Sequence, residues 1–474
     1  MRERNGAASG ELMRLLPSVD EALQRPEVRA LAPRVAPELL TELVRSALDA
    51  WRRTAKAERG DGAAVRARLE HAEWTRDVAA AVAREERAGL RRVVNASGVV
   101  LHTGLGRAPV HAEVALRMAE AARSYGTLEI ERETGERGQR DARLGALITR
   151  LLGCEAAIAV NNNAAAVVLA LSALARGKET VLSRGELVEI GGSFRMPDVM
   201  AAAGTTLREV GTTNRTRIGD YRAALGPASA LLLKVHTSNY RVRGFVEEAT
   251  AAELGALGRE FGLASFYDLG SGRVDAPGAP ELAMLGDEPD VRGALASGVD
   301  VISFSGDKLL GAPQAGILAG RAGTIARLRQ SPLYRALRLD KVTIAGLEAT
   351  FELLLAGRGA ELPTRAMLLA APERLARDAE RLAAGLRDVP GLAVDLVAST
   401  SQPGSGSAPD VFLPTTAVRV RHATLGPNAL AAALRLGEPP AVARVQVDGL
   451  LLDPRTLLAG DEERLLAAFR ALAR

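Results

Sequence analysis

The chain has 474 residues, enough for two or three domains with substantial cores. Its hydrophobic share of 47% and its charged share of 25% are those of an ordinary globular protein and exclude an intrinsically disordered chain. A net charge of +4 is too small to indicate nucleic-acid binding by a global basic field.

Cysteine and histidine usage excludes two further classes of site. The single cysteine, Cys154, cannot form an intrachain disulfide, and its apolar surroundings predict a buried small side chain rather than a nucleophile. The five histidines have no cysteine or carboxylate partners at metal-ligand spacing, so we predict no metal. Without an apolar signal segment or a run of roughly 18 apolar residues, we expect a cytoplasmic protein that has no membrane contact.

The amino-terminal part carries an almost wholly helical pattern, in which apolar residues between Leu39 and Trp51 recur at helical spacing. We expect residues 1–75 to form a small helical domain and residues 76–95 to form a linker helix. Residues 1–95 hold 18 Lys and Arg against 15 Asp and Glu, most of the chain's positive excess. A surplus of this size fits a solvated face as well as it fits an RNA-binding face.

From Val93 onward, apolar runs of strand length alternate with helical stretches. The runs are residues 156–160, 180–182, 231–235, 264–267 and 299–303. This rhythm predicts an α/β domain over residues 96–340, in which a mainly parallel sheet is covered by helices on both faces. Ligands of such sheets bind at the carboxyl ends of the strands.

Residues 341–474 begin with helical patterns and continue with strand patterns near 417–420 and 442–447. We therefore predict a carboxyl-terminal α+β domain. Glycine, serine and proline are dense in residues 400–407, which predicts a loop there.

Lys308 follows the apolar run that ends near residue 303, so its amine is predicted to lie at the carboxyl end of a strand. A lysine in this position can form a Schiff base with a carbonyl cofactor. Asp268 ends an earlier strand, and an aspartate followed by a strand-end lysine is typical of pyridoxal-phosphate enzymes, where the carboxylate faces the pyridine nitrogen. Taken singly, Lys308 could be a solvated loop lysine and Asp268 a helix cap, but their order favours a cofactor site.

Three asparagines, Asn161, Asn162 and Asn163, follow the strand 156–160 and open a helix. A strand, a tight turn and a helix amino terminus direct backbone N–H groups and the positive end of the helix dipole to one point, which suits a phosphate. The asparagine side chains are expected to add donors. By itself the triplet is a common helix start, and its position before Asp268 and Lys308 makes the phosphate site more specific.

His236 ends another predicted strand, and we expect its ring to contact the cofactor, with a packed histidine as the alternative. Arg184 and Glu189 are weaker candidates for the other face of the cofactor ring. Their alternative is that each forms a surface ion pair.

Three arginines are candidates for binding an anionic substrate. Arg107 follows a glycine-rich turn that precedes a helix, while Arg335 and Arg338 share one helical face if their segment is helical. Such a pair fits a clamp for a phosphate-like group. In a chain this rich in arginine, a solvated face is the default alternative.

These residues, in this order, resemble the bacterial selenocysteine synthase family, the L-seryl-tRNA(Sec) selenium transferases, which are fold-type I pyridoxal-phosphate enzymes. The resemblance spans nearly the whole chain, and its most specific segment surrounds Lys308. The segments that carry it are residues 16–20, 95–107, 161–162, 189–195, 212–214, 238–240, 268–272 and 304–311.

The resemblance implies pyridoxal 5'-phosphate as the cofactor and the conversion of L-seryl-tRNA(Sec) to L-selenocysteinyl-tRNA(Sec). The serine hydroxyl leaves by β-elimination, and selenium from selenophosphate adds in its place. Lys308 is implied as the Schiff-base lysine, Asp307 as a neighbouring catalytic acid, and Ser305 as a further cofactor contact. Either Asp307 or the released Lys308 supplies the proton for the leaving hydroxyl, and the sequence does not decide between them.

The resemblance also assigns Arg107, Arg335 and Arg338 to the phosphate of the selenium donor. It assigns the helical amino-terminal domain to the body of the tRNA, and it implies a ring-shaped homodecamer built from dimers. The chain departs from the family at residues 403–409, where a more glycine-dense loop is usual, and we assign that loop no role. Arg455 is read as structural, because an aminoacyl ester has no free carboxylate for it to bind.

Two competing functions fit parts of the sequence. A lyase of the same fold, acting on a small phosphorylated amino acid or sugar acid, would need Lys308 and the arginines but no helical domain. A tRNA-binding or scaffolding protein with an inactive cofactor site is a different class, and the intact pair of Asp268 and Lys308 argues against it.

Overall fold

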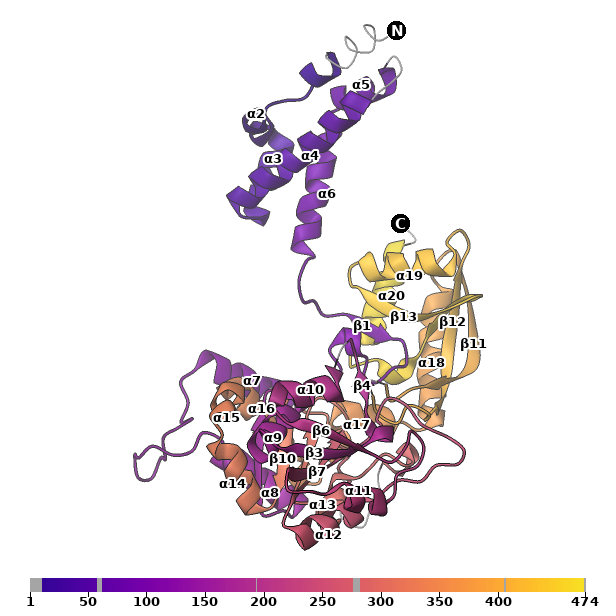
Figure 1. Cartoon of the computed structure of the whole chain (residues 1–474). Coiled ribbons are helices and arrows are strands. Elements are labelled where there is room, and N and C mark those ends of the chain that lie inside the picture. The colour runs from indigo at the N-terminus through magenta and orange to yellow at the C-terminus, as the bar shows by residue number, and fades with distance from the viewer. Residues whose placement is uncertain (1–10, 58–61, 193, 276–281, 405, 473–474) are drawn as a thin grey trace. The chain divides into compact units, whose positions relative to one another are not determined.

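The computed structural model describes residues 11–57, 62–192, 194–275, 282–404 and 406–472, and Figure 1 labels its helices and strands. The chain divides into two compact units, Met1–Arg92 and Val93–Arg474. None of the described helices is long and apolar enough to span a lipid bilayer.

The amino-terminal unit is helical, as its apolar spacing predicts. Its helices are α2 Val19–Gln24, α3 Pro26–Arg29, the short 3-10 helix η1 Ala32–Arg34, α4 Pro37–Ala57, α5 Ala63–Glu70 and α6 Trp74–Glu86. Ser18 and Glu21 form a capping box that fixes the start of α2. In the segment where a linker helix was expected over residues 76–95, α6 ends at Glu86 and contributes to the core of this unit.

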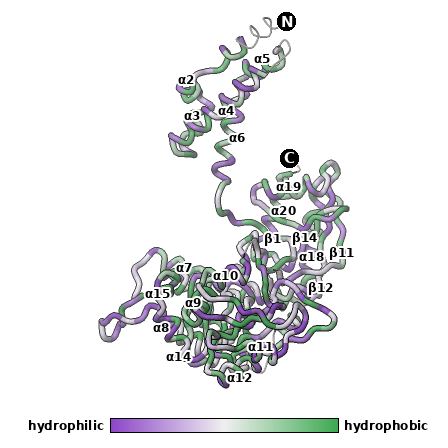
Figure 2. Tube along the Cα trace, in the orientation of Figure 1, coloured by the Kyte–Doolittle hydropathy of each residue, from purple (hydrophilic) through white to green (hydrophobic). Residues whose placement is uncertain are grey.

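One buried cluster holds these helices together. It includes Leu40, Val44, Leu48 and Trp51 of α4 and Trp74, Val78 and Val82 of α6. Because these residues recur every three or four positions, each helix buries one stripe, and hydrophobic and hydrophilic residues alternate along the tube in Figure 2. The indole N–H of Trp51 donates to Asp77 Oδ2 at 2.6 Å, which satisfies its one polar group.

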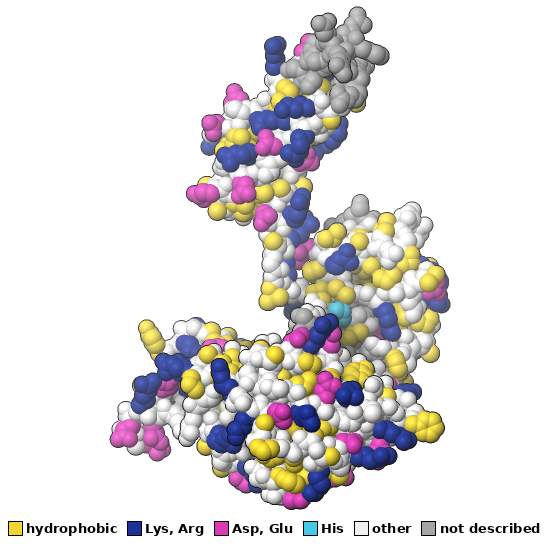
Figure 3. Space-filling model, viewed as in Figure 1, with side chains coloured by type: hydrophobic (Ala, Val, Ile, Leu, Met, Phe, Trp, Pro, Cys, Tyr) yellow, Lys and Arg dark blue, Asp and Glu magenta, His cyan; other side chains and the backbone are white. Residues whose placement is uncertain are grey.

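The surface of the amino-terminal unit mixes both signs of charge (Figure 3). Arg66 pairs with Glu11 at 2.6 Å and Arg68 with Glu73 at 2.8 Å, and these side chains are partly or largely exposed. Exposed ion pairs are screened by salt, so each contributes little to stability.

The second unit contains a seven-stranded sheet. Its strands are β2 Ala156–Val160, β3 Glu179–Ser183, β6 Thr206–Val210, β7 Ser229–Val235, β8 Ala264–Gly270, β9 Val301–Ser305 and β10 Gly316–Gly320. The order across the sheet is β2-β10-β9-β8-β7-β3-β6, and every neighbouring pair is parallel except the two that involve β10. This sheet confirms the predicted mainly parallel α/β architecture.

Helices cover both faces of this sheet, and short elements connect them. The helices are α7 Ala112–Arg123, α8 Ala142–Leu152, α9 Asn163–Ala175, α10 Met196–Ala203, α11 Ile218–Ala224, α12 Ala251–Phe261, α13 Val291–Ala296, α14 Ala322–Gln330, α15 Pro332–Leu337 and α16 Lys341–Leu355. The short elements are η2 Thr103–Leu105, η3 Arg184–Glu186, η4 Ala283–Leu285 and the hairpin strands β4 Glu189–Ile190 and β5 Phe194–Arg195.

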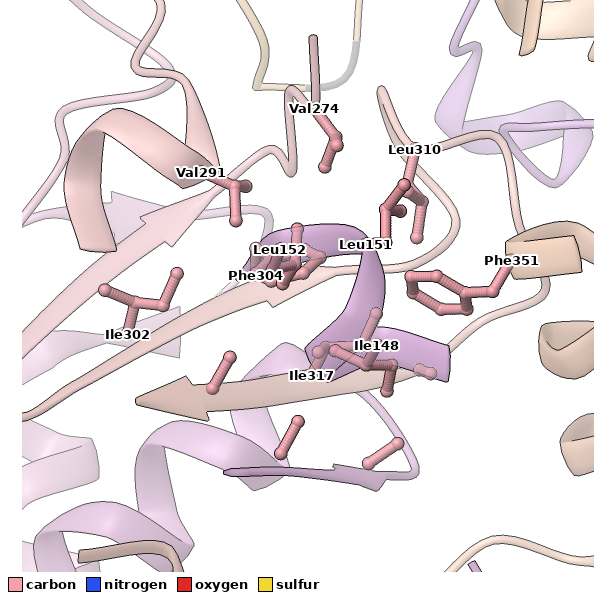
Figure 4. Packing of buried hydrophobic residues seen from close by; sticks show 14 of the residues in the cluster. Ile148, Leu151, Leu152, Val274, Val291, Ile302, Phe304, Leu310, Ile317 and Phe351 are labelled. Atoms are coloured by element: carbon pink, nitrogen blue, oxygen red, sulfur yellow. The ribbon is translucent and has the colours of Figure 1, made fainter. Parts of the chain in front are cut away.

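Alternation along the strands builds two cores. Ile317 of β10 faces the core under α8, α13 and α16, whereas its neighbour Leu318 faces the core under α9, α10 and α14. In Figure 4, Ile148 of α8 lies beside Ile317, and Phe304 of β9 belongs to the same cluster. A sheet buried on both faces needs such continuous apolar strands, so it holds the polar residues at its strand ends in fixed positions.

The carboxyl-terminal part forms a second, five-stranded sheet. Its elements are η5 Gly359–Glu361, α17 Pro363–Leu368, α18 Pro372–Arg387, β11 Leu392–Ser401, β12 Leu413–His422, α19 Pro427–Leu436, β13 Ala441–Gln446, β14 Gly449–Leu452, η6 Pro454–Thr456 and α20 Asp461–Leu472. The sheet order is β1-β13-β14-β12-β11, where β1 is Val94–Ala96. The predicted strands near 417–420 and 442–447 correspond to β12 and β13.

Strand β1 was not predicted, and it joins a distant part of the chain. Val94 pairs with Ala441 in parallel register, so the first strand after the amino-terminal unit belongs to the carboxyl-terminal sheet (Figure 1). The sequence expectation that residues from 96 onward begin the large α/β domain gave no sign of this pairing.

Candidate active site

Lys308 lies in the turn after β9, at the carboxyl end of the strand, and its side chain is largely buried. The turn is fixed by its backbone: the Leu309 N–H donates to the Ser271 carbonyl at 3.0 Å, and the Gly306 N–H donates to the Ala315 carbonyl at 2.8 Å. Burial, followed by the positive charge of Arg107, lowers the pKa of the Lys308 amine. A lowered pKa leaves more of this amine unprotonated, which suits a nucleophile and a base.

Asp307 and Arg107 form an ion pair next to this amine. Arg107 Nη1 donates to Asp307 Oδ2 at 2.6 Å, and the Ala108 N–H contacts the Asp307 carbonyl at 3.4 Å. Arg107 adopts a left-handed backbone conformation with φ of 65°, uncommon for a residue with a side chain. Within the described part of the chain, its buried Nε atom has no hydrogen-bond partner. The pair places a cation and a carboxylate together beside Lys308.

Asp268 is buried within β8, beside the strand that leads to Lys308. Its Oδ1 atom accepts hydrogen bonds from Asn163 Nδ2 at 2.8 Å and from Ser303 Oγ at 3.0 Å. Burial raises the pKa of this carboxyl group, although both hydrogen bonds act in the opposite direction. A buried carboxylate is stabilised by a cationic partner, so Asp268 suits the protonated pyridine nitrogen of a cofactor.

The asparagine turn differs from its predicted arrangement. Asn162 is the N-cap of α9, and its Oδ1 accepts from the Ala165 N–H at 2.8 Å, while the Asn163 amide is directed to Asp268. These side chains therefore stabilise the helix start and the buried carboxylate. For a phosphate, the turn offers the amino-terminal end of α9 with its dipole, as predicted from the strand-turn-helix pattern.

Gly316 of β10 permits the close approach of this turn. A Cβ atom at Gly316 would lie 2.1 Å from the Asn162 carbonyl oxygen and 2.8 Å from the Asn163 nitrogen. Only glycine fits there, so β10 fixes the height of the turn above the sheet. Asn161 is held from the other side, because its N–H donates to the Leu337 carbonyl at 3.1 Å.

His236 follows β7, and its backbone N–H donates to the Asp268 carbonyl at 2.9 Å. Its ring Nε2 lies 3.4 Å from Oε2 of Glu288, whose side chain is fully buried. Burial acts to raise the pKa of Glu288, but the His236 ring and the Ala408 N–H outweigh it and hold the pKa below the ordinary value. His236 is thus placed between the Asp268 strand and a buried carboxylate.

The two arginines after α14 do not share a helical face. Helix α15 ends at Leu337, and Arg338 is extended, with ψ of 148°. The helix ends where the chain meets β2, because the backbone of Arg338 forms a bridge with Val160, the last residue of that strand. No hydrogen bond or ion pair joins either guanidinium, Arg335 or Arg338, to any residue that the structure describes. The expected clamp on one helical face is therefore wrong. Arg335 lies on α15, whereas Arg338 lies in an extended segment beside Asn161, and neither guanidinium has a partner among the described residues.

Other predicted candidates fall into surface or structural positions. Arg184 pairs with Glu209 at 2.8 Å and Glu189 with Arg195 at 2.9 Å, and all four side chains are exposed. Arg184 and Glu189 therefore each form a surface ion pair, which was the alternative to a contact with the cofactor ring.

Arg455 is buried and donates to the Ser401 hydroxyl and to the Met367 and Pro414 carbonyls, which is a structural role. Cys154 is partly buried beside the core, and burial raises the pKa of its thiol, which disfavours a nucleophile. Ser305 is the last residue of β9 and is buried opposite Gly316.

Unsatisfied polar atoms surround Lys308 and Asp268. Among the described residues, Asn163 Oδ1, Ser238 Oγ and Ser407 Oγ are buried without a hydrogen-bond partner. Buried polar atoms in native proteins are normally paired, so these atoms fit a polar ligand. With a buried amine, a buried carboxylate and a helix amino terminus, the residues present fit pyridoxal phosphate.

Three elements of this site were missed by the sequence analysis. Glu288 lies among turn residues with no periodic pattern, and nothing local marks it as buried. Ser303 is one of several serines in a strand. A loop was predicted over residues 400–407, but β11 continues to Ser401, and no local signal reports that Gly406 approaches Lys308.

A metal centre is not formed by the residues that the structure describes, since none of their His, Cys, Asp and Glu side chains gather in groups of three or more that could hold an ion.

Comparisons with known proteins agree with this geometry. A family model described as L-seryl-tRNA selenium transferase matches residues 93–458, and one described as the selenocysteine synthase N terminal region matches residues 13–52. Proteins named L-seryl-tRNA(Sec) selenium transferase from Moorella thermoacetica and Solidesulfovibrio magneticus are each 47% identical to the chain. The first alignment covers 97% of both chains and the second 98% of both.

Among solved structures, a D-glucosaminate-6-phosphate ammonia-lyase is similar with a TM-score of 0.56 and 23% identity, covering 82% of this chain and 98% of that one. At this identity the likeness shows the fold alone. That shared fold is the predicted fold-type I α/β architecture.

Proposed function

The chain belongs to the L-seryl-tRNA selenium transferase family, and on that premise we propose how its own residues carry out the reaction. It is a pyridoxal-phosphate enzyme that converts L-seryl-tRNA(Sec) to L-selenocysteinyl-tRNA(Sec). The observation that carries the residue assignment is the buried Lys308 amine, which lies beside the Arg107 and Asp307 ion pair and one strand away from buried Asp268.

Lys308 is assigned as the residue that attaches the cofactor and, once free, removes the proton from Cα of the seryl group. Its lowered pKa supports both roles, because each requires the neutral amine. Bound pyridoxal phosphate supplies an electron sink for the electron pair that this proton leaves behind.

Four further groups are assigned to hold the cofactor. Asp268 meets the pyridine nitrogen, and the hydrogen bonds from Asn163 and Ser303 keep its carboxylate oriented. His236 contacts the ring, and Ser305 and the turn of Asn161 to Asn163 bind polar groups at the carboxyl ends of the strands. The amino terminus of α9 is the phosphate subsite.

Asp307 is assigned to the leaving hydroxyl, to which its carboxylate relays the proton that Lys308 takes from Cα. Hydroxide is a poor leaving group, so departure of the serine oxygen from Cβ requires a proton. Asp307 is within the turn that presents Lys308, and its contact with Arg107 fixes its position. A D307N variant that still binds cofactor but no longer releases water from the seryl group would separate this role from that of Lys308.

Selenophosphate is proposed as the selenium donor, and Arg107, Arg335 and Arg338 as the binders of its phosphate. Arginine suits this task because its planar donors match phosphate oxygens. The assignment of Arg335 and Arg338 is supported because neither guanidinium has a hydrogen bond or ion pair with a described residue. The helical unit of residues 1–92 is proposed to bind the tRNA, and the chain to assemble in the cytoplasm as a ring-shaped homodecamer built from dimers.

Turnover of seryl-tRNA(Sec) with selenophosphate tests this proposal, with the full chain compared with a chain that begins at Val93. We expect the shortened chain to keep the cofactor's visible absorbance, because the second unit has its own cores, and to lose most of its activity on the tRNA substrate. Equal turnover of free serine or a small phosphorylated amino acid by both chains would contradict the tRNA assignment. It would favour the small-molecule lyase, which the sequence relatives do not support.

A further inference from the structure

The loop that follows β11 reaches the Lys308 amine from the carboxyl-terminal sheet. Gly406 has φ of 66°, and a Cβ atom built on it would lie 3.7 Å from Lys308 Nζ and 3.5 Å from Ser238 Oγ. The backbone of this loop therefore forms a wall against the amine. Glycine suits this position because the left-handed backbone disfavours a side chain.

A single buried carboxylate fastens this loop. Oε2 of Glu288 accepts the Ala408 N–H at 2.9 Å and lies 3.4 Å from His236 Nε2 and 3.5 Å from Arg241 Nη2. The side chain of Glu288 is 0% exposed, so these partners replace water at Oε2, while Oε1 has no hydrogen-bond partner among the described residues. His236 and Arg241 follow β7, whereas Ala408 belongs to the carboxyl-terminal part, so the carboxylate joins two separate parts of the chain.

The fastened position is one that the loop would not adopt by local preference. Ala408 has φ of 44°, in the left-handed region that residues with side chains avoid. A strained residue persists only where surrounding contacts fix it, and the hydrogen bond from its N–H to Glu288 is such a contact. Loss of the carboxylate would therefore release the loop.

We propose that Glu288 is a positioning residue, which orients the His236 ring and holds the segment of residues 406–408 closed over Lys308. This inference rests on the proposed cofactor site. Its consequence is that water and small nucleophiles reach Lys308 slowly while the loop is closed. Among the described residues, Glu288 makes no hydrogen bond with Lys308 or Asp268. Its hydrogen bonds act through His236 and Ala408, and its charge opposes the lowering of the Lys308 pKa.

Two measurements on the full-length chain test this proposal in Glu288→Gln and Glu288→Ala. The first is hydrogen exchange of the backbone amides of residues 406–411, measured with and without cofactor. The second is the rate at which hydroxylamine removes the cofactor from the loaded protein, followed by its absorbance. We expect Glu288→Ala to speed both by at least about tenfold, because a buried hydrogen bond to a charged group is lost. Glu288→Gln keeps one acceptor oxygen and should have a smaller effect.

Glu186→Gln is the matched control. Glu186 is also buried, directly after β3, and accepts a hydrogen bond from Lys234 at 2.9 Å. None of its hydrogen bonds or ion pairs among the described residues involves residues 406–408. We expect this variant to lower thermal stability without changing the exchange of residues 406–411 or the hydroxylamine rate. An equal effect of both variants on the loop would overturn the proposal, since it would mean that loss of any buried carboxylate loosens this region.

Gly406→Ala provides a second route to the same result if Glu288→Ala fails to fold. The added methyl group would disfavour the left-handed backbone at this position and so loosen the loop while leaving Glu288 intact, and hydroxylamine should again react faster. Unchanged exchange and unchanged hydroxylamine rates in Glu288→Gln and Gly406→Ala would overturn the proposal. Exchange without cofactor does not depend on the substrate, so this outcome is distinguishable from failure of the seryl-tRNA assignment.

Discussion

The strand ends around Lys308 and the helices of the amino-terminal unit are both rich in charge, but they use it differently. Around Lys308, the side chains of Lys308, Asp307, Asp268 and Glu288 are at most 8% exposed, and each has specific neighbours. In the amino-terminal unit, ion pairs such as Arg34 with Glu86 have side chains 41% and 34% exposed.

This difference in burial teaches where a single substitution matters. A buried charge depends on a few fixed partners and loses much when one is removed, whereas an exposed charge is compensated by water and salt. On the proposed assignment, catalysis therefore depends on a few buried residues around Lys308. Recognition of a polyanion by the helical unit would instead be a sum of many small contributions.

Lys308→Ala should have the largest effect. The variant removes both the attachment point of the cofactor and the base, so we expect turnover to fall by about a thousandfold or more. The visible absorbance of the attached cofactor should vanish as well. Lys178→Ala, at an exposed lysine, is the control and should change neither quantity. A Lys308→Ala protein with wild-type absorbance would remove the basis of the site assignment.

Asp268→Asn is expected to lower turnover by about a hundredfold, because the pyridine nitrogen loses its anionic partner. The same change should stabilise the cofactor-free protein at neutral pH. Burial raises the pKa of Asp268 above its unfolded value, so the folded state binds the proton more tightly. Stability from this group is then present below about pH 4 and is lost as the pH rises through the folded pKa.

Thermal unfolding of the cofactor-free proteins between pH 5 and pH 8 measures this second effect. Ordinary carboxyl groups, with a pKa of about 4, are already ionised in this range. The advantage of Asp268→Asn should shrink as the pH is lowered. A cofactor-free variant less stable than the wild type at neutral pH would show that Asp268 is stabilised by its partners even without the cofactor.

Arg335→Ala and Arg338→Ala should each raise the KM for selenophosphate by about tenfold, because a charged hydrogen bond to phosphate is worth roughly 1.5–3 kcal/mol. Cofactor absorbance and affinity for the tRNA should be unchanged. Arg327→Ala, at an exposed arginine of α14, is the matched control. If the three variants behave alike, the solvated-face alternative holds for this arginine-rich segment.

Trp51→Phe should have the smallest effect. It removes the hydrogen bond to Asp77 while keeping an aromatic ring in the core, so the amino-terminal unit should lose about 1 kcal/mol of unfolding free energy. Denaturant unfolding followed by circular dichroism measures the loss. The cofactor absorbance should not change, and a coupled loss of cofactor would show that the two units unfold together.

The sequence predicted those parts of the molecule that local patterns encode. The α/β rhythm, the strand-end positions of Lys308 and Asp268 and the helix start at Asn163 follow from periodicity and from turn residues. The match to the family follows from the order of the motifs. These features need only a window of neighbouring residues.

The remaining features depend on contacts between distant segments. Arg338 was expected on a helix, but its backbone pairs with Val160 and is extended. Glu288 gains its meaning only from His236 and Ala408, which come from different parts of the chain. No spacing rule connects such residues, because their proximity is created by the packing of the two sheets.

The pairing of β1 with β13 has a consequence for synthesis of the chain. Val94 leaves the ribosome early, but its partner Ala441 is made only near the end. At about 5–20 residues per second, β1 waits on the order of tens of seconds for its neighbour. The helical unit, whose core is built from its own helices, can fold during this interval, while the edge of β1 stays open to wrong partners. Slow translation or an early stop would therefore leave a folded helical unit attached to an incomplete enzyme.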